Sequence, residues 1–493
     1  MPKRPNIVLL FNDHQAYYRH GWDVGVRPQR PHFARVAAGG VEFSRAYSPC
    51  PLCTPARRSL WTGLYPHNHR FYTLGSDPAE PPNNLMFSHL AEQGYLLHYY
   101  GKWHAGPGTA SDYGCEGFSL PHYGNPYTAA EYKDYCAQRG LPEASFDVKA
   151  TFYEGRASRR PPLGPGYQCT WESLIPHSAA VLETPDDTHE AFFLANLACD
   201  KLEQLARSAD ERPFFLTVHF WGPHMPYWPS QRYVDMVDAA AIQPYGSFDD
   251  TLEGRPAVYW TETNRPISEN RRLISPNPVP WETWRVFLQH SYAQSTMVDA
   301  AGGRVLDRLE ALGLSEDTLV IWTTDHGDAI ASHGGHFDKN AYLTEEVLRV
   351  PMAVSWPGRI GEGQVRQELI SLIDVAPTLL DAAGTGFEDR IDGASMLPLL
   401  TQESDEWRPT LVAETYGHHG ERVVGRAVIG DRFKYNVYRY LDSDEVEHEL
   451  LDLTDDPYEL ANVVSRPDLR ERVSGLRQAL QRHRTATRDP VEW

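Results

Sequence analysis

Four short apolar runs punctuate the sequence, and each one ends at a cluster of polar side chains. The runs cover residues 7–11, 95–100, 214–220 and 319–323. A continuous apolar run is typical of a strand that is buried on both faces, as strands of parallel sheets are. Ligands of open α/β sheets bind beyond the carboxyl ends of such strands. The pattern therefore predicts an α/β fold with a functional site where these four strands end.

The residues that follow the four runs have side chains suited to binding metals and anions. The dipeptide Asp-His occurs twice, after the first run and after the last, and the other two runs are followed by Gly-Lys-Trp-His and Trp-Gly-Pro-His. Carboxylate oxygens and imidazole nitrogens are ligands for divalent cations, and Lys and His donate hydrogen bonds to oxyanions. A strand-end Asp can equally cap a helix, and a lone His can be a packed core residue. The candidates are Asp13, His14, Lys102, His104, His224, Asp325 and His326.

The segment Cys53–Gly63 reads Cys-Thr-Pro-Ala-Arg-Arg-Ser-Leu-Trp-Thr-Gly. We predict that a helix begins here, with Thr54 as N-cap and Pro55 in the first helical position. The free N–H groups of such a helix start attract anions, and Arg57 adds a positive charge one turn later. The thiol would then lie at an anion-binding helix end. Two simpler interpretations are a buried structural thiol and a redox or zinc pair formed with Cys50.

The Cys53–Gly63 segment resembles the signature of the type I sulfatases, Cys-x-Pro-x-Arg followed by Leu-x-Thr-Gly, a family of the alkaline phosphatase superfamily. Further segments resemble that family in the same order along the chain. The resemblance implies that a formylglycine-generating enzyme oxidises Cys53 to formylglycine. The hydrated aldehyde would attack sulfur and later expel sulfate by elimination. The other matching segments are residues 6–13, 101–106, 222–226, 323–327 and 336–345.

The resemblance also implies a role for each candidate residue. Carboxylate and imidazole groups hold one divalent cation, with Ca²⁺ as the usual ion of the family and Mn²⁺ favoured if two His take part. A basic pair stabilises the aldehyde hydrate and the sulfate oxygens, a His accepts the geminal proton that triggers elimination, and two further residues bind the sulfuryl oxygens, one of them protonating the leaving group. The implied metal ligands are Asp13, Asp325, His326 and modified Cys53, with His14 as a further candidate. The basic pair is Arg57 and Lys102, and the residue that accepts the geminal proton is His104. The residues that bind the sulfuryl oxygens are His224 and Lys339.

The resemblance and the local patterns together predict two domains. Residues 1–396 would form a catalytic α/β domain, a large mixed and mostly parallel sheet sandwiched by helices, with loop insertions near 107–185 and 229–280. Residues 397–493 would form a small antiparallel sheet with a helix. Helical spacing covers 186–209 and, in one or two helices, 284–312; short β-like stretches cover 410–414, 423–429, 433–440 and 449–452; and an amphipathic helix covers 470–482.

The composition narrows the partners and the location of the protein. The 493 residues carry a formal net charge of −20, which argues against binding to nucleic acid or to an anionic membrane surface. An anionic substrate must then be attracted by a local positive site. The six cysteines show no disulfide framework, no segment approaches a membrane span, and the first residues show no signal peptide. We expect a cytoplasmic location, and homo-oligomerisation stays open.

These observations predict a hydrolase of sulfuric esters that acts on a sulfated carbohydrate, with aryl sulfates as surrogate substrates. The nearest alternative is a phosphonate monoester or phosphodiester hydrolase of the same superfamily, because residues 50–57 also resemble that branch. The segment Gly-Lys-Trp-His-Ala-Gly at residues 101–106 favours the sulfatase branch. An inactive binding protein with the same fold is a more remote alternative, because every expected catalytic position is filled.

Overall fold

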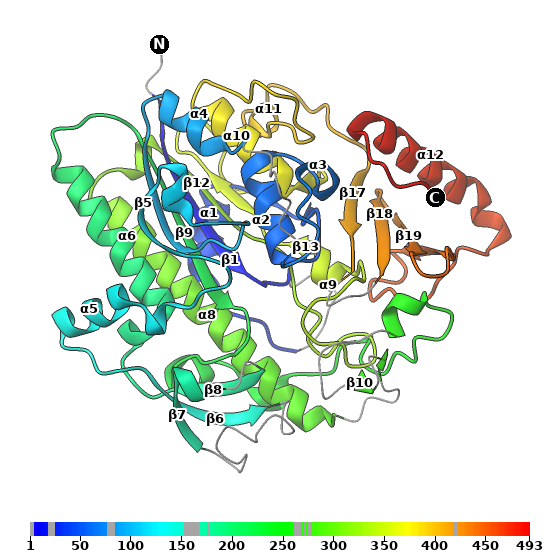
Figure 1. Cartoon of the computed structure of the whole chain (residues 1–493), viewed down its shortest axis with the longest axis horizontal. Coiled ribbons are helices and arrows are strands. Elements are labelled where there is room, and N and C mark those ends of the chain that lie inside the picture. The colour runs from blue at the N-terminus through cyan, green and yellow to red at the C-terminus, as the bar shows by residue number, and fades with distance from the viewer. Residues whose placement is uncertain are drawn as a thin grey trace.

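A large mixed sheet forms the centre of the protein (Figure 1). The computed structural model describes residues 4–17, 25–75, 84–151, 167–174, 177–260, 268–269, 272–273, 279–417 and 422–493. In spatial order the eight strands are β15 (Gln364–Arg366), β2 (Gly40–Phe43), β14 (Ala353–Ser355), β12 (Thr318–Thr324), β1 (Asn6–Asp13), β9 (Phe214–Pro223), β4 (Leu96–Lys102) and β5 (Glu116–Leu120). The strands from β12 to β5 are parallel, whereas β14 is antiparallel to both of its neighbours. The predicted large, mostly parallel sheet is confirmed.

The central strand β1 is buried on both faces. Val8 and Leu10 pack into the core on one face, and Ile7, Leu9 and Phe11 pack into the core on the other. Each fully buried side chain of this size contributes about 1.5–3 kcal/mol relative to exposure. A shift of one residue would exchange the two sets of side chains, so the packing fixes the register of β1 and the position of the residues that follow it.

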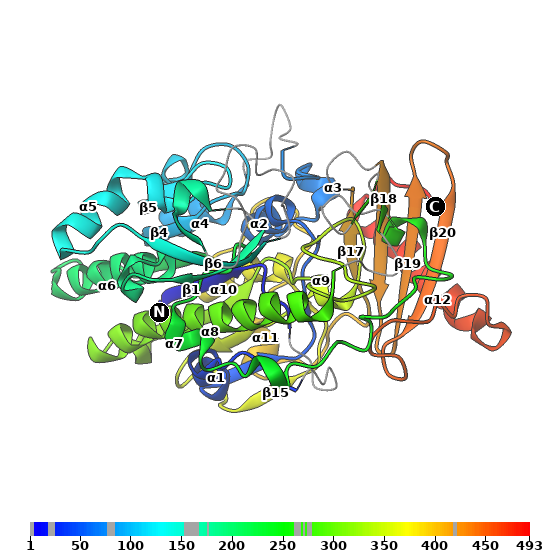
Figure 2. The ribbon, with the colours of Figure 1, turned by 90° about the horizontal axis from the view of Figure 1, so that it is seen from below.

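Helices cover both faces of the sheet. Figure 2 shows α2 and α4 on the opposite side of β1 from α1 and α8. The long helix α8 is continuous, where one or two helices were predicted, and it packs so closely that a Cβ atom on Gly302 would lie 2.5 Å from the ring of Trp322. One layer consists of α1 (Pro31–Ala38), α6 (Glu190–Arg207) and α8 (Trp281–Ala311), and the other of α2 (Cys53–Thr62), α4 (Met86–Glu92) and α10 (Val375–Ala382).

A second, antiparallel sheet lies beside the large sheet, with α12 along it (Figures 1 and 2). Its strands are β17 (Leu411–Thr415), β18 (Val423–Ile429), β19 (Phe433–Tyr440) and β20 (Val446–Asp452), paired in that order. The apolar side of α12 (Arg470–Thr487) shares a small buried core with these strands. The predicted small C-terminal sheet and its helix are therefore both present.

Buried ion pairs connect the second sheet to the part of the chain before residue 397. The ammonium group of Lys434, on β19, is fully buried and contacts the carboxylates of Glu345, at 3.2 Å, and Glu459. Arg255 Nε lies 2.8 Å from Glu449 Oε1, and neither side chain is exposed. Removing one member of such a pair leaves an uncompensated buried charge. Buried charged groups therefore join the second sheet to Glu345 and to the insertion at residues 229–280.

The two predicted loop insertions contain more regular structure than expected. Strand β5 of the large sheet lies within residues 107–185, and so does a separate three-stranded antiparallel sheet. One strand of this small sheet, β8, is buried at all five positions. The elements of the insertions are α5 (Ala130–Arg139), β6 (Ser145–Thr151), β7 (Tyr167–Thr170), β8 (Ser178–Leu182), α7 (Gln231–Val234), β10 (Ser268–Glu269) and β11 (Arg272–Leu273).

Short elements connect these layers. The short elements are β3 (Ala46–Tyr47), α3 (Pro66–His69), α9 (Glu345–Leu348), β13 (Arg349–Val350), β16 (Ile370–Ser371) and α11 (Leu397–Leu400).

All six cysteines are buried and unpaired, so Cys50 and Cys53 form no disulfide. None of the helices in the described part of the chain is both long and apolar enough to cross a membrane.

Candidate active site

The carboxyl ends of β1 and β12 place two aspartates side by side. The strands pair in parallel with Asn12 opposite Thr324, so that Asp13 and Asp325 follow at the same edge of the sheet. Both aspartates are fully buried. The site predicted from the ends of apolar runs therefore forms through the pairing of two strands that are far apart in the sequence.

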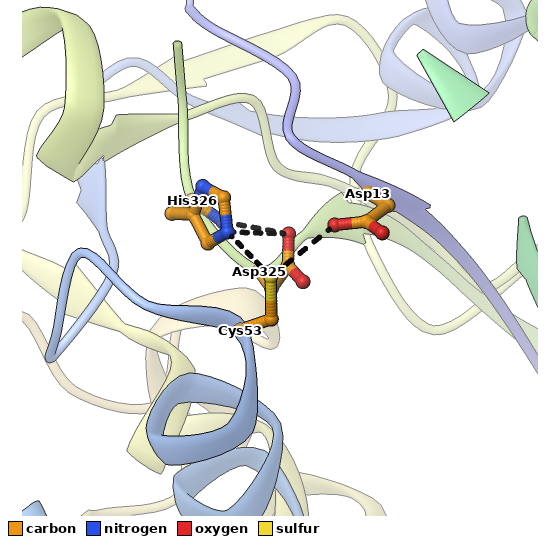
Figure 3. A group of neighbouring side chains, drawn as sticks. All are labelled: Asp13, Cys53, Asp325 and His326. Carbon is orange, nitrogen blue, oxygen red and sulfur yellow. Dashed lines mark hydrogen bonds and ion pairs between the residues drawn. The ribbon is translucent and has the colours of Figure 1, made fainter. Parts of the chain in front are cut away.

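Cys53 is the first residue of α2, and its side chain points toward these carboxylates (Figure 3). Its Sγ atom lies 3.1 Å from Nε2 of His326 and 3.8 Å from Oδ1 of Asp13. Cys53 is only 1% exposed. Burial raises the pKa of its thiol to about 12. The unmodified thiol is therefore protonated near neutral pH and is a weak nucleophile.

The helix that carries Cys53 begins earlier than predicted. Its N-cap is Leu52, which has an extended backbone and is completely buried. The hydroxyl of Thr54 is buried without a hydrogen-bond partner among the described residues, and Pro55 occupies the third helical position. The prediction that Thr54 caps this helix is wrong, because burial of Leu52 in the core sets the start of the helix.

Four side chains could hold a divalent cation at this point. One ligand atom from each of Asp13, Cys53, Asp325 and His326 lies within 4.8 Å of the others. Nδ1 of His326 donates to the carbonyl of Gly327 at 2.8 Å, which leaves the Nε2 lone pair directed at the cluster. Imidazoles that bind metals typically have an outer hydrogen bond of this kind. The donor set and its orientation therefore fit a divalent cation.

Electrostatics also favour a cation here. Burial and the neighbouring charge of Asp325 raise the pKa of Asp13 to about 6, although Lys102 and Arg57 act in the opposite direction. Burial lowers the pKa of His326 to about 4, so its imidazole is neutral and able to act as a ligand near pH 7. A cation between the two carboxylates would reduce their repulsion.

Two buried basic residues adjoin the carboxylates. Arg57 Nε donates to Asp325 Oδ2 at 2.8 Å, and the ammonium group of Lys102 binds the other aspartate while lying 3.9 Å from the thiol sulfur. Burial opposes ionisation of Asp325, but His326 and Arg57 outweigh it and hold the pKa of that carboxyl well below its usual range. Arg57 is thus engaged with the metal-ligand candidates, whereas Lys102 reaches both a carboxylate and the nucleophile position.

His14 lies beside this cluster, and its ring belongs to a different group. Its backbone N–H donates to Asp325 Oδ1 at 3.0 Å. Its Nε2 lies 3.3 Å from Asp338 Oδ1, and its ring centroid is 4.6 Å from that of His224. Neither ring nitrogen of His14 has a hydrogen-bond partner within the described residues. The ring of His14 thus groups with His224 and Asp338, and its role as a further metal ligand stays a prediction.

A second basic group faces the same site. Lys339 Nζ donates to Asp338 Oδ1 at 2.9 Å and to His224 Nε2 at 3.1 Å. Nδ1 of His224 donates to the carbonyl of Met225 at 2.6 Å, which fixes its Nε2 as an acceptor. Lys339 is only 2% exposed. The predicted sulfuryl-binding residues His224 and Lys339 thus contact each other.

His104 lies next to these groups in a left-handed backbone conformation, with a φ of 40°. Its Nδ1 is buried and lacks a hydrogen-bond partner in the part of the chain that the structure describes. Burial, Lys102 and Arg57 hold the pKa of His104 well below its usual range. A neutral, unpartnered imidazole nitrogen can accept a proton.

Three contributing residues were missed by sequence reasoning. His219 Nδ1 accepts from Arg57 Nη1 at 3.1 Å, but this His lies inside an apolar strand and gives no local signal. Asp338 directly precedes Lys339, so its position next to a predicted residue could have identified it. Tyr123 lies in an insertion with no periodicity, and its ring centroid is 4.2 Å from Lys102 Nζ.

The sequence model of the sulfatase family matches residues 5–385, and that of the C-terminal domain of N-sulphoglucosamine sulphohydrolase matches residues 332–486. The chain is 25% identical over 487 residues to an arylsulfatase from Clostridium perfringens, covering 97% of this chain and 94% of that protein. It is 24% identical over 537 residues to an N-acetylglucosamine-6-O-sulfatase from Bacteroides thetaiotaomicron, covering 97% of this chain and 86% of the relative.

Solved structures share the fold. The phosphonate monoester hydrolase of Agrobacterium radiobacter matches with a TM-score of 0.75 at 21% identity, covering 98% of this chain and 96% of that one. A protein solved in complex with its substrate D-glucosamine-2-N,6-O-disulfate matches with a TM-score of 0.71 at 20% identity, covering 99% of each chain. The family match spans far more than half of the sequence. The chain therefore belongs to the sulfatase family of the alkaline phosphatase superfamily and is an enzyme that hydrolyses sulfuric ester bonds.

Proposed function

We propose that the enzyme removes sulfate from a carbohydrate, with formylglycine at position 53 as the nucleophile and one divalent cation beside it. The observation that carries the proposal is the burial of the Cys53 sulfur among Asp13, Asp325 and His326. Cleavage of a sulfate ester requires a nucleophile, neutralisation of the sulfuryl charge and a proton for the leaving oxygen. Groups of all three kinds surround this atom.

The environment of Cys53 supports its conversion. With a pKa of about 12, the unmodified thiol would attack a sulfate ester poorly at neutral pH. A hydrated aldehyde supplies two hydroxyl groups on one carbon, so that one can bond to sulfur while the other later gives up its proton. That second hydroxyl makes release of sulfate by elimination feasible.

The surrounding side chains would move the protons. His104 is neutral near pH 7 and has an unpartnered Nδ1, so it suits acceptance of the proton that triggers elimination. Lys339 donates to His224, and this pair can bind sulfuryl oxygens and supply a proton to the leaving oxygen. Lys102 adds positive charge 3.9 Å from the sulfur of Cys53.

The cation would be held by both aspartates, His326 and the modified residue 53. Bound there, it would neutralise the sulfuryl charge and favour ionisation of a coordinated hydroxyl. The oxygen-rich ligand set favours Ca²⁺, and the imidazole leaves Mn²⁺ as the second candidate.

A sulfated sugar is the favoured substrate. One relative is an N-acetylglucosamine-6-O-sulfatase, and one solved structure of the same fold contains D-glucosamine-2-N,6-O-disulfate. Aryl sulfates would serve as surrogate substrates because their leaving groups are good. The cytoplasmic location expected from the sequence stays a prediction, and the oligomeric state stays open.

The test combines modification and activity. The chain should be co-expressed with a formylglycine-generating enzyme, and the peptide around residue 53 analysed by mass spectrometry for replacement of the thiol by an aldehyde. Sulfate release from 4-nitrophenyl sulfate and from sulfated monosaccharides should follow conversion, and Cys53→Ala should abolish it. The matched control is Cys50→Ala, which removes a buried thiol three residues away. Converted, metal-loaded protein that releases sulfate from none of these esters would overturn the proposal.

A phosphonate monoester hydrolase is the second candidate, because enzymes of that name share this fold with TM-scores of 0.75 and 0.74. Its chemistry would use the same nucleophile and cation on a phosphorus centre. Comparing kcat/KM for an aryl sulfate with that for an aryl phosphonate monoester on one preparation separates the two. A higher value for the phosphonate would favour the second candidate.

A further inference from the structure

A pocket of about 560 Å³ adjoins His224. This volume lies within the range of about 300–1,000 Å³ that is typical of small-molecule sites. Six of its nine lining residues come from the insertion at residues 107–185 and the other three are residues 224–226. The pocket is therefore built mainly by a part of the chain that contributes none of the candidate metal ligands.

Tyr123 connects this pocket to the reacting groups. It lines the pocket, and its hydroxyl lies 3.4 Å from Nδ1 of His224. Lys102 Nζ lies 4.2 Å from the centroid of its ring, and the ring of His104 packs edge-on against it at 5.9 Å. Tyr123 thus contacts three of the residues assigned to the reaction. A molecule in the pocket would adjoin the position of the sulfuryl group.

An aromatic side chain forms one wall of the pocket. Trp171 is partly buried, and two neighbours fix its ring: Tyr127 at 5.2 Å and the buried Trp228 in a perpendicular arrangement at 5.2 Å. A ring held in this way needs little ordering when a ligand packs on it. The apolar C–H face of a sugar, or an aryl ring, suits such a wall.

The charges at the pocket differ from those around the nucleophile. Glu172 is exposed and lines it, and no described lining residue is Lys or Arg. A second sulfate group would meet a carboxylate here with no permanently cationic side chain among these lining residues to balance it. A hydroxyl or amino group would instead find an acceptor.

We propose, on the basis of the sulfatase function above, that this pocket holds the alcohol part of the ester. It selects a sugar ring that has an apolar face and carries no second sulfate group. Trp171 is the specificity-determining residue for the ring, and Glu172 is the specificity-determining residue against a second anionic group.

The first experiment measures binding of the sugar ring separately from binding of the sulfate group. Trp171→Ala should lower kcat/KM for glucosamine 6-sulfate about tenfold, while the inhibition constant of inorganic sulfate, which needs only the sulfuryl site, stays within about twofold of the wild-type value. Trp171→Phe, which keeps an aromatic ring, should retain most of the activity and guards against misfolding of the Ala variant. A proportional change in both quantities, or no change in kcat/KM, would overturn the role of Trp171.

The second experiment tests the charge. The wild type should have a higher kcat/KM for glucosamine 6-sulfate than for glucosamine 2-N,6-O-disulfate. Glu172→Gln should lower that ratio about threefold to tenfold, a range expected for one screened charge. The matched control Glu131→Gln removes an exposed carboxylate from α5, outside the pocket lining, and should leave the ratio unchanged. A wild-type preference for the disulfated sugar, or equal ratios in wild type and Glu172→Gln, would overturn the inference.

The two proposals fail in different ways. A converted wild-type enzyme that releases sulfate from no ester contradicts the proposed function. If the enzyme releases sulfate but its preference among sugars does not change when residues 171 and 172 are replaced, only the assignment of the pocket is contradicted.

Discussion

Replacing His333 tests whether its charge stabilises the segment that carries Lys339. His333 is fully buried, with Nδ1 3.2 Å from Asp250 Oδ2 and Nε2 3.4 Å from Glu346 Oε1. Burial opposes protonation, but the carboxylates of Glu346 and Asp250 outweigh it and raise the pKa of His333 to about 9. The protonated ring of His333 therefore links the segment that carries Lys339 to the insertion at residues 229–280, through Asp250, and to α9, through Glu346.

The magnitude follows from the difference between the folded and unfolded states. The pKa of His333 is about 9 in the folded protein, against an ordinary value of 6.5. Because the folded value is the higher one, the stabilisation is fully present below about pH 6.5 and is lost as the pH rises through about 9. At about 1.4 kcal/mol per pH unit, the difference between the folded and unfolded pKa values corresponds to about 3 kcal/mol in the free energy of unfolding.

Urea denaturation at about pH 6 and about pH 9.5 measures the effect. Between these values the wild type should lose about 3 kcal/mol more stability than His333→Asn. Asn is chosen because it tolerates the left-handed backbone of this residue, which has a φ of 43°. The control is His122→Asn, an exposed position with a φ of 56°. Equal pH dependence in the wild type and His333→Asn would refute the reasoning.

Four other changes have expected outcomes. Lys434→Met leaves two buried carboxylates without their cation and should cost about 3–5 kcal/mol in urea denaturation; a loss below about 1 kcal/mol would contradict the ion-pair assignment. Gly302→Ala should destabilise by about 1–3 kcal/mol because the added Cβ meets Trp322. Gly475→Ala, at an exposed position of α12 with open space around it, should stabilise the protein by up to about 1 kcal/mol. If thermal melting shifted the Tm of Gly302→Ala and of Gly475→Ala in the same direction, the close packing of Gly302 against Trp322 would be contradicted. Dialysis against a chelator should lower Tm and stop sulfate release, and added Ca²⁺ or Mn²⁺ should restore both; full activity without metal would argue against a cation beside Cys53.

The main strands and their chemistry could be predicted because two constraints coincide. A run such as 7–11 or 319–323 is apolar throughout only if both faces are covered, and these runs lie within β1 and β12. Parallel pairing then brings the residues after both runs to one edge of the sheet. Asp13 and Asp325 are adjacent for this reason, so their proximity could be expected without knowing how the rest of the chain folds.

The features that escaped prediction depend on tertiary contacts. Local capping rules favoured Thr54, but core packing of Leu52 sets the start of α2. His219 contacts Arg57 from within an apolar strand, where sequence pattern alone cannot separate a packed His from a functional one. The pocket wall at Trp171 is formed by an insertion whose order comes from aromatic neighbours rather than from periodicity.

The burial of Cys53 limits when another protein could reach its side chain. At 1% exposure its thiol is out of reach of a second protein once α2 has packed, and it lies against His326, which is synthesised 273 residues later. At about 5–20 residues per second, the ribosome needs about 14–55 seconds to make the intervening chain. If an enzyme oxidises this side chain, as proposed, it must reach Cys53 before α2 packs against His326, and the synthesis of the intervening chain is one such interval.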